Sequence, residues 1–599
     1  MRLALSAVLL LAAAPVAMLP VSVAAAVAVQ ARSPALAKVF RDSDEDQLRR
    51  NPLAALSRGD LRYADRFGDF LSDASIAANR AAAERDLAAL TRIDRAALSP
   101  ADKVSYDVFR FQTLDSIEGL KPEYVRATIV RPIDHFFGFH TFFPDFSSGN
   151  SVAPFNTLAD YENNLKRIDG FVATLDAAIG RFREGEASGV TQPVLVVDNV
   201  LGQLDALIAQ GVVNSPFMGP TKKFPAAIAA ADRTRLTAAY TAAVRDKIDP
   251  AYVRLRDFLK TEYRPHARTS VGLGQMPGGP ALYAYLVRST TTTDMTPAQI
   301  HALGLSEVAR IKAGMEAIRR KVGFEGTLAQ FFVHLREDKQ FQPASAQAFG
   351  DQFRAIKAKT EAQLPRLFSL VPKGALEIRT VPDYVAKNQA GAYYQGGTPD
   401  GSRPGVFYYN TYDLPSRQTF ENESLFLHEG EPGHHFQISL AQEDANLPAF
   451  QRFGGNTAYV EGWALYSESL GGELGLFTDP YQKFGNLNAE MLRAMRLVVD
   501  TGIHSMGWTR DQSIAYMLDN SAMGRTDATA EVERYIAIPS QALAYKVGQL
   551  TIRRLRTKAE HELGPKFDVR QFHARVLEDG ALPMAVLEAK IDAWIAAGR

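Results

Sequence analysis

Three of the eleven histidines of the chain lie within eight positions, in the stretch LFLHEGEPGHHFQ that begins at residue 425. His428 is followed directly by Glu429, a pairing that zinc hydrolases use for a metal ligand and for the carboxylate that takes a proton from water. The usual signature places two histidines four residues apart on one face of a helix. Here histidine returns only at His434 and His435. The stretch is therefore a candidate metal site in which the helix must be distorted.

Neither later histidine suits a regular helix that contains His428. Each residue adds about 1.5 Å along the helix axis and about 100° around it. His435 would share the face of His428 but stand ~10.5 Å further along, and His434 would point to a different side. Pro432 has no N–H for the carbonyl four residues back, and the glycines around it tolerate unusual dihedral angles. The backbone is therefore predicted to bulge, and spacing alone leaves open which histidine becomes the second ligand.

A third ligand is predicted in the stretch NTAYVEGWALYSESL, residues 456–470. A catalytic zinc site takes three protein ligands and leaves one position open. Glu461 lies among apolar residues, and a carboxylate buried there needs a partner such as a metal. Glu468 follows seven residues later on the same face of a helix. We expect it to support a ligand or to lie at the surface, without binding the metal itself.

The rest of the chain predicts a mostly α-helical protein. Apolar residues recur at intervals of three and four in residues 82–93, 160–182 and 306–322. The exceptions are residues 375–381 and 405–411, which are β-branched and aromatic and predict a small β-element next to the zinc-binding helix.

Four tyrosines lie in or near this β-element: Tyr393, Tyr394, Tyr408 and Tyr409. Packing is one interpretation of these side chains. The other is an edge strand that pairs with an extended peptide, and that uses the tyrosines to bind substrate. We expect the second, because the strands lie beside a possible catalytic helix.

Composition and charge limit the classes of partner and of metal ligand that we expect. The formal net charge of the 599 residues is +0, so nothing indicates a nucleic acid as partner. The chain has no cysteine, so any metal must be held by histidine or carboxylate. An apolar start with small residues predicts a signal peptide over residues 1–26, cleaved within 26–31, and a secreted or periplasmic protein without a stable membrane anchor. An uncleaved anchor is the alternative.

Beyond the signal, we expect a helical part over residues 32–270 and a catalytic helical part over residues 271–599, joined as one continuous domain. The oligomeric state is not predicted.

The motifs resemble a known family. HEGEPGHHFQ, with YVEGWALYSE downstream, is similar to the domain-of-unknown-function family 885, which is grouped with the gluzincin metallopeptidases near the carboxypeptidase Taq and oligopeptidase families. The resemblance extends to PDGSRPGVFYYNT, VDTGIHSMGWTRDQ and RYIAIPSQALAYKVG, and covers most of the chain from about residue 270 onward. It implies a large helical metallopeptidase body with a deep cleft.

The resemblance also implies roles for individual residues. The zinc ligands that it implies are His428, His434 and Glu461, with Glu429 as the general base. His504 and Tyr545 are similar to residues that stabilise the oxyanion in related peptidases, and core packing is about as good an explanation of each. His435 would then turn towards the substrate side, or towards a carboxylate behind the ligands.

We therefore expect an exported zinc-dependent hydrolase that cleaves amide bonds of short peptides, with Zn²⁺ as its cofactor. One alternative is a metal-dependent hydrolase of a non-peptide amide or of an amino-acid conjugate. Another is a non-catalytic binding protein with structural zinc, although such a site has no use for a base beside a ligand. The direction of cleavage and the metal used in the cell stay open.

Overall fold

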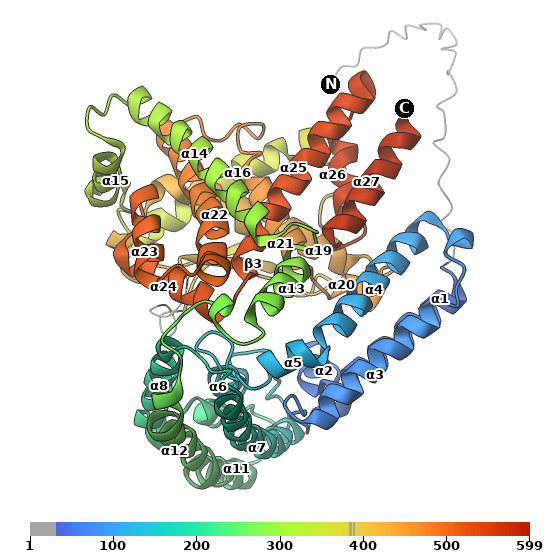
Figure 1. Ribbon diagram of the computed structural model, residues 1–599, viewed down its shortest axis with the longest axis vertical. Coiled ribbons are helices and arrows are strands. Elements are labelled where there is room, and N and C mark those ends of the chain that lie inside the picture. Colours follow the sequence, from blue (N-terminus) through green and yellow to red (C-terminus); the bar gives the residue numbers. More distant parts are fainter. Residues whose placement is uncertain (1–31, 383–385, 387–389) are drawn as a thin grey trace, which may run out of the picture.

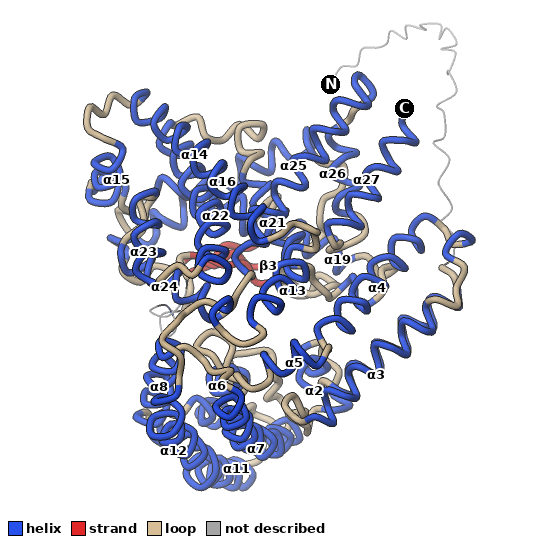
Figure 2. Tube along the Cα trace, in the orientation of Figure 1, coloured by secondary structure: helices blue, strands red, loops and turns tan. Residues whose placement is uncertain are grey.

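The computed structural model describes residues 32–382, 386 and 390–599, so the expected signal peptide lies outside the described residues. The described chain is mostly α-helical, as predicted, and its strands form one small sheet near the centre (Figures 1 and 2). Within those described residues, no helix is both long enough and apolar enough to cross a lipid bilayer.

The helices before residue 270 form the lower half of Figure 1 and the bundle along its right side. They are α1 Pro34–Arg50, α2 Pro52–Ser57, α3 Asp73–Leu90, α4 Pro100–Gly119, α5 Pro122–Thr128, α6 Phe139–Phe146, α7 Leu158–Ser188, α8 Val194–Ala209, α9 Gly211–Asn214, α10 Gly219–Lys222, α11 Ala230–Ala243 and α12 Asp249–Phe258.

The helices after residue 270 form the upper half, and they carry every residue of the predicted metal site. They are α13 Gly279–Thr291, α14 Pro297–Lys321, α15 Leu328–Glu337, α16 Ala346–Leu367, α18 Asn422–Glu429, α19 His434–Glu443, α20 Ala449–Arg452, α21 Thr457–Glu468, α22 Pro480–Met506, α23 Arg510–Asn520, α24 Arg525–Ala537, α25 Ala544–Leu563, α26 Val569–Leu577 and α27 Met584–Gly598.

Each half has a large apolar core mostly of its own, and a smaller core joins the two halves through Ala127, Val130 and Val190. One core draws all its buried members from between Leu53 and Ala267. Another joins α16, the sheet, α18, α21 and α25, and takes a single buried residue, Val108, from the first half. The division at residue 270 itself stays a prediction.

The sheet has three strands, β1 Leu376–Thr380, β2 Ala392–Gln395 and β3 Gly405–Tyr409. Their spatial order is β1-β3-β2, with β1 parallel and β2 antiparallel to β3. The small β-element is thus confirmed, and β2 lies at one edge of the sheet beside α18.

Helices α21 and α25 cross at two glycines. A Cβ added to Gly548 would overlap the carbonyl oxygen of Ala458, and a Cβ added to Gly462 would overlap the Cα of Gly548. Only glycine permits two helix backbones to come so near. This contact fixes α21 against α25 at Gly462, the residue next to Glu461.

Candidate metal centre

The structure brings together three of the predicted ligands. His428, His434 and Glu461 each offer one donor atom, and these atoms lie within 4.8 Å of one another. Oε2 of Glu461 is 3.6 Å from Nε2 of His428 and 3.5 Å from Nε2 of His434. Both histidines are buried. Two imidazole nitrogens and one carboxylate oxygen that converge in a buried place are a donor set typical of zinc.

The two histidines come from separate helices, because the predicted bulge is a complete break. Helix α18 ends at Glu429, and α19 begins at His434 after a turn that contains a cis peptide bond between Glu431 and Pro432. A Cβ on Gly433 would overlap the carbonyl oxygens of Leu427 and His428. The chain therefore folds back onto the end of α18 at a glycine, and His434 enters beside His428.

Helix α21 fixes the turn between the two histidines. The indole Nε1 of Trp463 donates to the carbonyl oxygen of Pro432 at 2.8 Å, and Oγ of Ser467 donates to the same oxygen at 3.3 Å. The helix that supplies Glu461 thus also fixes the turn that positions His434. Neither side chain was predicted to belong to the site, since a tryptophan and a serine in a helix give no signal of this kind.

A carboxylate orients the first histidine. Oε1 of Glu468 lies 2.8 Å from Nδ1 of His428, and its Oε2 accepts from Oγ of Ser424 at 2.5 Å. Asn486 on α22 donates to Ser424 Oγ at 3.2 Å. An acceptor on Nδ1 leaves Nε2 of a neutral imidazole with its lone pair turned towards the cluster. This is the supporting position expected for Glu468.

Charge within the cluster is strongly coupled. Burial alone would lower the pKa of His428, but its contacts with Glu461 and Glu468 raise that pKa to about 10. Burial opposes ionisation of Glu461, yet both histidines hold its pKa well below the usual range. The cluster therefore favours a positive charge between its members, which a divalent cation would supply.

Glu429 lies at the end of α18 and is half-buried. Its Oε2 accepts from the backbone N–H of Tyr394 on β2 at 3.0 Å. The carboxylate predicted to act as the base thus lies between the donor cluster and the edge strand of the sheet. Glu429 belongs to the helix that carries His428, and it also contacts the strand that is expected to bind substrate.

His435 lies outside the donor cluster. Its Nδ1 is 3.1 Å from the hydroxyl of Tyr394, and its Nε2 is 3.1 Å from the carbonyl oxygen of Gly374. Burial lowers its pKa to about 4. The neutral ring therefore donates through Nε2 and accepts through Nδ1, and it holds Tyr394 in place.

The four tyrosines divide between the two faces of the sheet, because side chains alternate along a strand. Tyr393 and Tyr408 are paired in register, and their rings stack at 5.0 Å between centroids. Tyr394 points to the other face, towards His435. The prediction that Tyr409 binds substrate is wrong: it is 3% exposed and packs on Phe349.

The two residues proposed for the oxyanion are not part of the donor cluster. His504 is buried, accepts from the N–H of Leu273 through Nδ1 and bonds the carbonyl oxygen of Tyr535 through Nε2. Both ring nitrogens are therefore engaged by backbone, and burial lowers the pKa to about 3. This corrects the catalytic role predicted for His504, which has no nitrogen left for an oxyanion.

Tyr545 lies on α25, which packs on α21. Its hydroxyl is 3.4 Å from Nη2 of Arg534. An oxyanion role for this tyrosine stays a prediction.

A cavity of about 1450 Å³ adjoins the sheet. Tyr393, Gln395 and Tyr408 line one side, and residues from the first half of the chain, among them Tyr161 and Phe224, line the other. No sequence signal linked these distant segments. The deep cleft that the resemblance implies stays a prediction.

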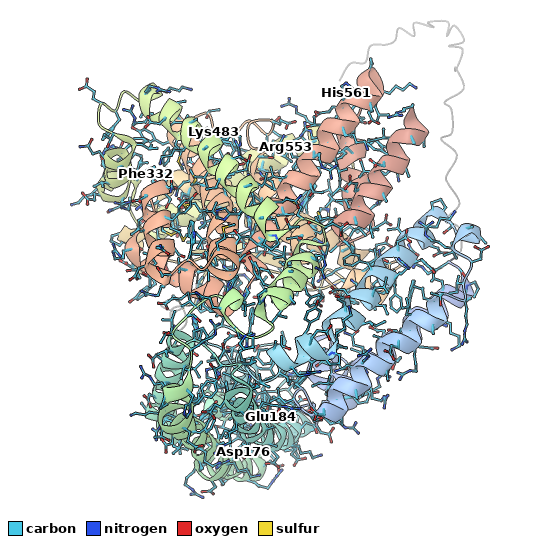
Figure 3. All side chains as sticks on the ribbon, viewed as in Figure 1. Asp176, Glu184, Phe332, Lys483, Arg553 and His561 are labelled. Carbon is cyan, nitrogen blue, oxygen red and sulfur yellow. The ribbon has the colours of Figure 1, made fainter. Side chains whose placement is uncertain are left out.

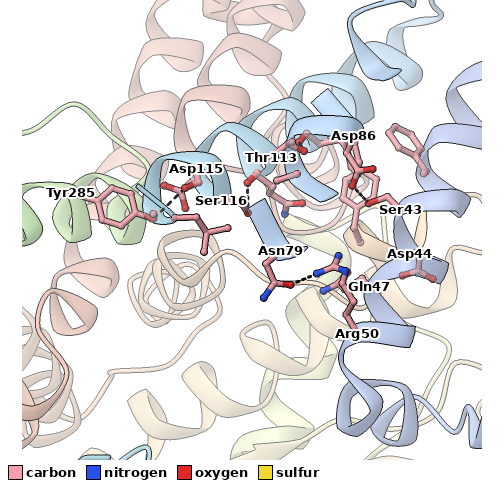
Figure 4. A pocket seen from close by; sticks show the side chains of 17 residues that line it. Ser43, Asp44, Gln47, Arg50, Asn79, Asp86, Thr113, Asp115, Ser116 and Tyr285 are labelled. Atoms are coloured by element: carbon pink, nitrogen blue, oxygen red, sulfur yellow. Dashed lines mark hydrogen bonds between the residues drawn. The ribbon is translucent and has the colours of Figure 1, made fainter. Parts of the chain in front are cut away.

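A smaller cavity of about 530 Å³ lies between α1, α3 and α4 (Figure 4). Its lining includes hydrogen-bonded polar side chains: Oγ of Ser43 donates to Asp86 at 2.6 Å, and Arg50 bonds Asn79. None of the predicted site residues lines it.

The model of a family described as "Bacterial protein of unknown function (DUF885)" matches residues 52–591. No curated protein matches the chain. A solved structure described as "the putative lipoprotein from Colwellia psychrerythraea" is similar with a TM-score of 0.85 and 27% identity, over 94% of this chain and 99% of that one. A "putative lipoprotein of unknown function from Shewanella oneidensis" has a TM-score of 0.71 over 93% and 99%, and at 19% identity shows the fold alone.

Proposed function

We propose that this chain, which belongs to the DUF885 family, is a zinc-dependent hydrolase of amide bonds in short peptides, as in the gluzincin metallopeptidases that its motifs resemble. One observation carries the proposal. Two imidazoles and a carboxylate converge within 4.8 Å, and the residue next to one of these ligands is a half-buried glutamate. A purely structural zinc site is closed by four protein ligands, whereas three donors converge here and a glutamate stands beside one of them.

The donor set fits zinc chemistry. Zinc bound by His428, His434 and Glu461 would polarise a carbonyl group and lower the pKa of water to ~7. The hydrogen bond between Glu468 and Nδ1 of His428 keeps the imidazole ring turned so that its Nε2 points at the cluster. Cobalt, manganese and nickel also accept imidazole and carboxylate ligands, so the metal in the cell is a matter for direct analysis.

Glu429 moves the proton. Its carboxylate accepts a proton from the attacking water, whose oxygen forms a bond with the carbonyl carbon of the substrate. The same carboxyl then gives the proton to the amide nitrogen as the carbon–nitrogen bond breaks, which releases an amine and a carboxylic acid. Its bond to the N–H of Tyr394 keeps Glu429 oriented before substrate arrives.

The edge strand β2 binds the substrate. Its one side pairs with β3, so an extended peptide can add along the other, next to Glu429. Tyr393 and Tyr408 lie on the face of the sheet that adjoins the large cavity, where side chains of the peptide have room.

Export is part of the proposal. The two similar structures are described as lipoproteins, and the apolar start of this chain is typical of a signal peptide. The chain has no cysteine that could carry a lipid, so we expect a periplasmic or secreted protein.

The test combines a substrate panel with one variant. Purified, zinc-loaded protein is incubated with short peptides and N-acyl amino acids, and products are identified by mass spectrometry. Glu429→Gln keeps the shape of the side chain, so it should retain the metal while turnover falls by a factor of ~10² or more. Hydrolysis at the wild-type rate by a metal-loaded Gln variant removes Glu429 from the reaction. If the loaded wild type cleaves nothing in the panel, the proposal fails.

A further inference from the structure

Three arginines surround the side chain of Tyr545. The guanidinium carbon of Arg496 lies 4.6 Å from the centroid of the ring, and that of Arg493 lies 5.9 Å away. Nη2 of Arg534 is 3.4 Å from the tyrosine hydroxyl. Two arginines come from α22 and one from α24, so three helices meet around one phenol ring.

These cations have few anions to balance them. In the described part of the chain, Glu531 is the one carboxylate that forms an ion pair with any of the three. It accepts from Arg496 at 2.9 Å and lies 3.7 Å from Arg534. Glu421 also interacts electrostatically with Arg493, but burial raises the pKa of Glu421 and favours its neutral form. The group therefore carries more positive than negative charge.

Two buried donors of the group lack a partner. Arg496 is 4% exposed, and its Nη1 makes no hydrogen bond with any described residue. Nε of Arg493 is also buried and makes no hydrogen bond with any described residue. A buried donor without an acceptor is costly, especially on a charged group, and calls for an explanation. An acceptor that arrives with the substrate provides one.

The group lies on the helices that flank the ligands. On α22, Asn486 contacts Ser424 and the carbonyl of Glu468, and Arg493 follows seven residues later on the same face. On α25, Tyr545 precedes Gly548 by three residues. Gly548 touches α21 on either side of Glu461, at Ala458 and Gly462. Solvent reaches the group through Arg534, whose side chain is 23% exposed.

We propose that Arg493, Arg496 and Arg534, arranged around Tyr545, bind the free α-carboxylate at the carboxyl end of a substrate peptide. The substrate class is then a short peptide or acyl amino acid that ends in a free acid, from which the enzyme releases the carboxyl-terminal residue or residues. Guanidinium groups suit this task, because their planar donors match the two oxygens of a carboxylate. The inference rests on the hydrolase function proposed above.

Substrate preference tests the inference without any variant. Three peptides of one sequence are compared: one with a free carboxyl end, one with a carboxamide end, and one with a carboxamide end whose last residue is aspartate. We expect kcat/KM for the free acid to exceed that for the plain amide on the order of 10- to 100-fold, the effect of charged hydrogen bonds. Restoration of the rate by the aspartate side chain would move the bound group from the chain end to a side chain, and would overturn the assignment to the α-carboxylate.

Arg534→Met and Arg496→Lys test the residues. Arg534 is partly exposed, so its replacement should fold, and circular dichroism checks both variants. Each should reduce the ratio of kcat/KM for free acid to that for amide, mainly through KM. Arg553→Met is the matched control, because Arg553 on α25 (labelled in Figure 3) also stacks on a tyrosine, with its guanidinium carbon 5.4 Å from the ring centroid of Tyr466, and it is not a member of the group. The control should keep the wild-type ratio.

A binding measurement separates this inference from the proposed function. Acetyl-alanine and its amide are titrated into wild type and Arg534→Met by calorimetry. Preference for the acid in wild type, lost in the variant, supports the carboxylate site even if no peptide is cleaved. Equal hydrolysis of acid and amide, together with equal binding, overturns the inference while the hydrolase function stands.

Discussion

His434 and His435 are neighbours in the sequence with opposite surroundings. His434 joins the donor cluster, whereas both ring nitrogens of His435 are engaged by Tyr394 and the carbonyl of Gly374. We therefore expect His434→Ala to lose the metal. His435→Ala should retain it but turn over more slowly, because Tyr394 is no longer held. Metal analysis of both purified variants decides: metal-free His435→Ala beside loaded His434→Ala would reverse the assignment.

Glu461 and Glu468 are one heptad apart on α21 and are expected to affect metal binding to different extents. Glu461→Ala removes one of three donors, so metal affinity should fall severely. Glu468→Ala removes only the acceptor on Nδ1 of His428, and a loss of about 10- to 100-fold is typical of such a change. Competition with a chelating dye measures both. A larger loss for Glu468→Ala than for Glu461→Ala would contradict the ligand assignment.

The sequence led to His428 and Glu461 by residue chemistry and to His434 by the family resemblance. The structure brings the donor atoms of these three residues together, and their role as metal ligands stays a prediction. The sequence-based prediction failed for Tyr409, because assigning a tyrosine to one face of a strand requires the register of the sheet. It failed for His504, because a histidine whose ring nitrogens are hydrogen-bonded to distant backbone groups cannot be distinguished in sequence from a catalytic one.

At the scale of elements, the crossing of α21 and α25 is expected to control the metal site. Gly548→Ala would place a methyl group against the carbonyl of Ala458 and push α21, the helix that carries Glu461, away from α25. We expect both a lower thermal midpoint and weaker metal binding. Gly202→Ala on α8 is the control, since nothing lies within 4 Å of the new Cβ, and it should stabilise the helix by about 0.5–1 kcal/mol. Wild-type metal affinity in Gly548→Ala would show that the crossing does not position Glu461.

Helices were the most predictable elements. Residues 160–182 lie within α7, and residues 306–322 lie within α14 except for Val322, which follows its last residue. The distortion at Pro432 was also foreseen, but as a bulge within one helix. The chain instead makes a full turn between α18 and α19, stabilised by Trp463 and Ser467 on another helix. Contacts between residues 31 and 35 positions apart have no local signal.

At the scale of the whole molecule, buried histidines predict how stability depends on pH. Burial lowers the pKa of His140, His435 and His573 to about 4, and of His504 to about 3. In the unfolded chain these groups titrate near ~6.5. Between these values the unfolded state binds more protons, so stability is full above pH ~6.5 and is lost as the pH falls towards 4.

Buried carboxyls act in the opposite direction. Burial raises the pKa of Glu431 and Asp500 to about 7, so the folded state keeps their protons and gains stability as the pH falls. The four histidines outnumber the two carboxyls whose pKa reaches about 7, so the histidines decide the sign. We expect the free energy of unfolding to drop as the pH falls from 6 to 5, by at most about 1.4 kcal/mol for each histidine that no carboxyl compensates. Urea titrations at both pH values measure it, and an unchanged midpoint would contradict the prediction.

The arrangement of distant segments was beyond the sequence. The large cavity combines Tyr393 and Tyr408 with Tyr161 and Phe224, more than 150 residues away in the chain. The arginines around Tyr545 come from α22 and α24, and each alone is an ordinary helical arginine. Only tertiary structure brings such residues together.

The bond from Trp463 to Pro432 gives the protein an internal optical probe. The chain has three tryptophans, and this one is fully buried, with its indole N–H bonded to the turn that separates the two histidine ligands. The emission of an indole responds to its hydrogen bond and to charge nearby. If the proposed site takes up a cation between His428 and His434, we expect the fluorescence of the native chain to change, so that metal exchange could be followed in real time without a label.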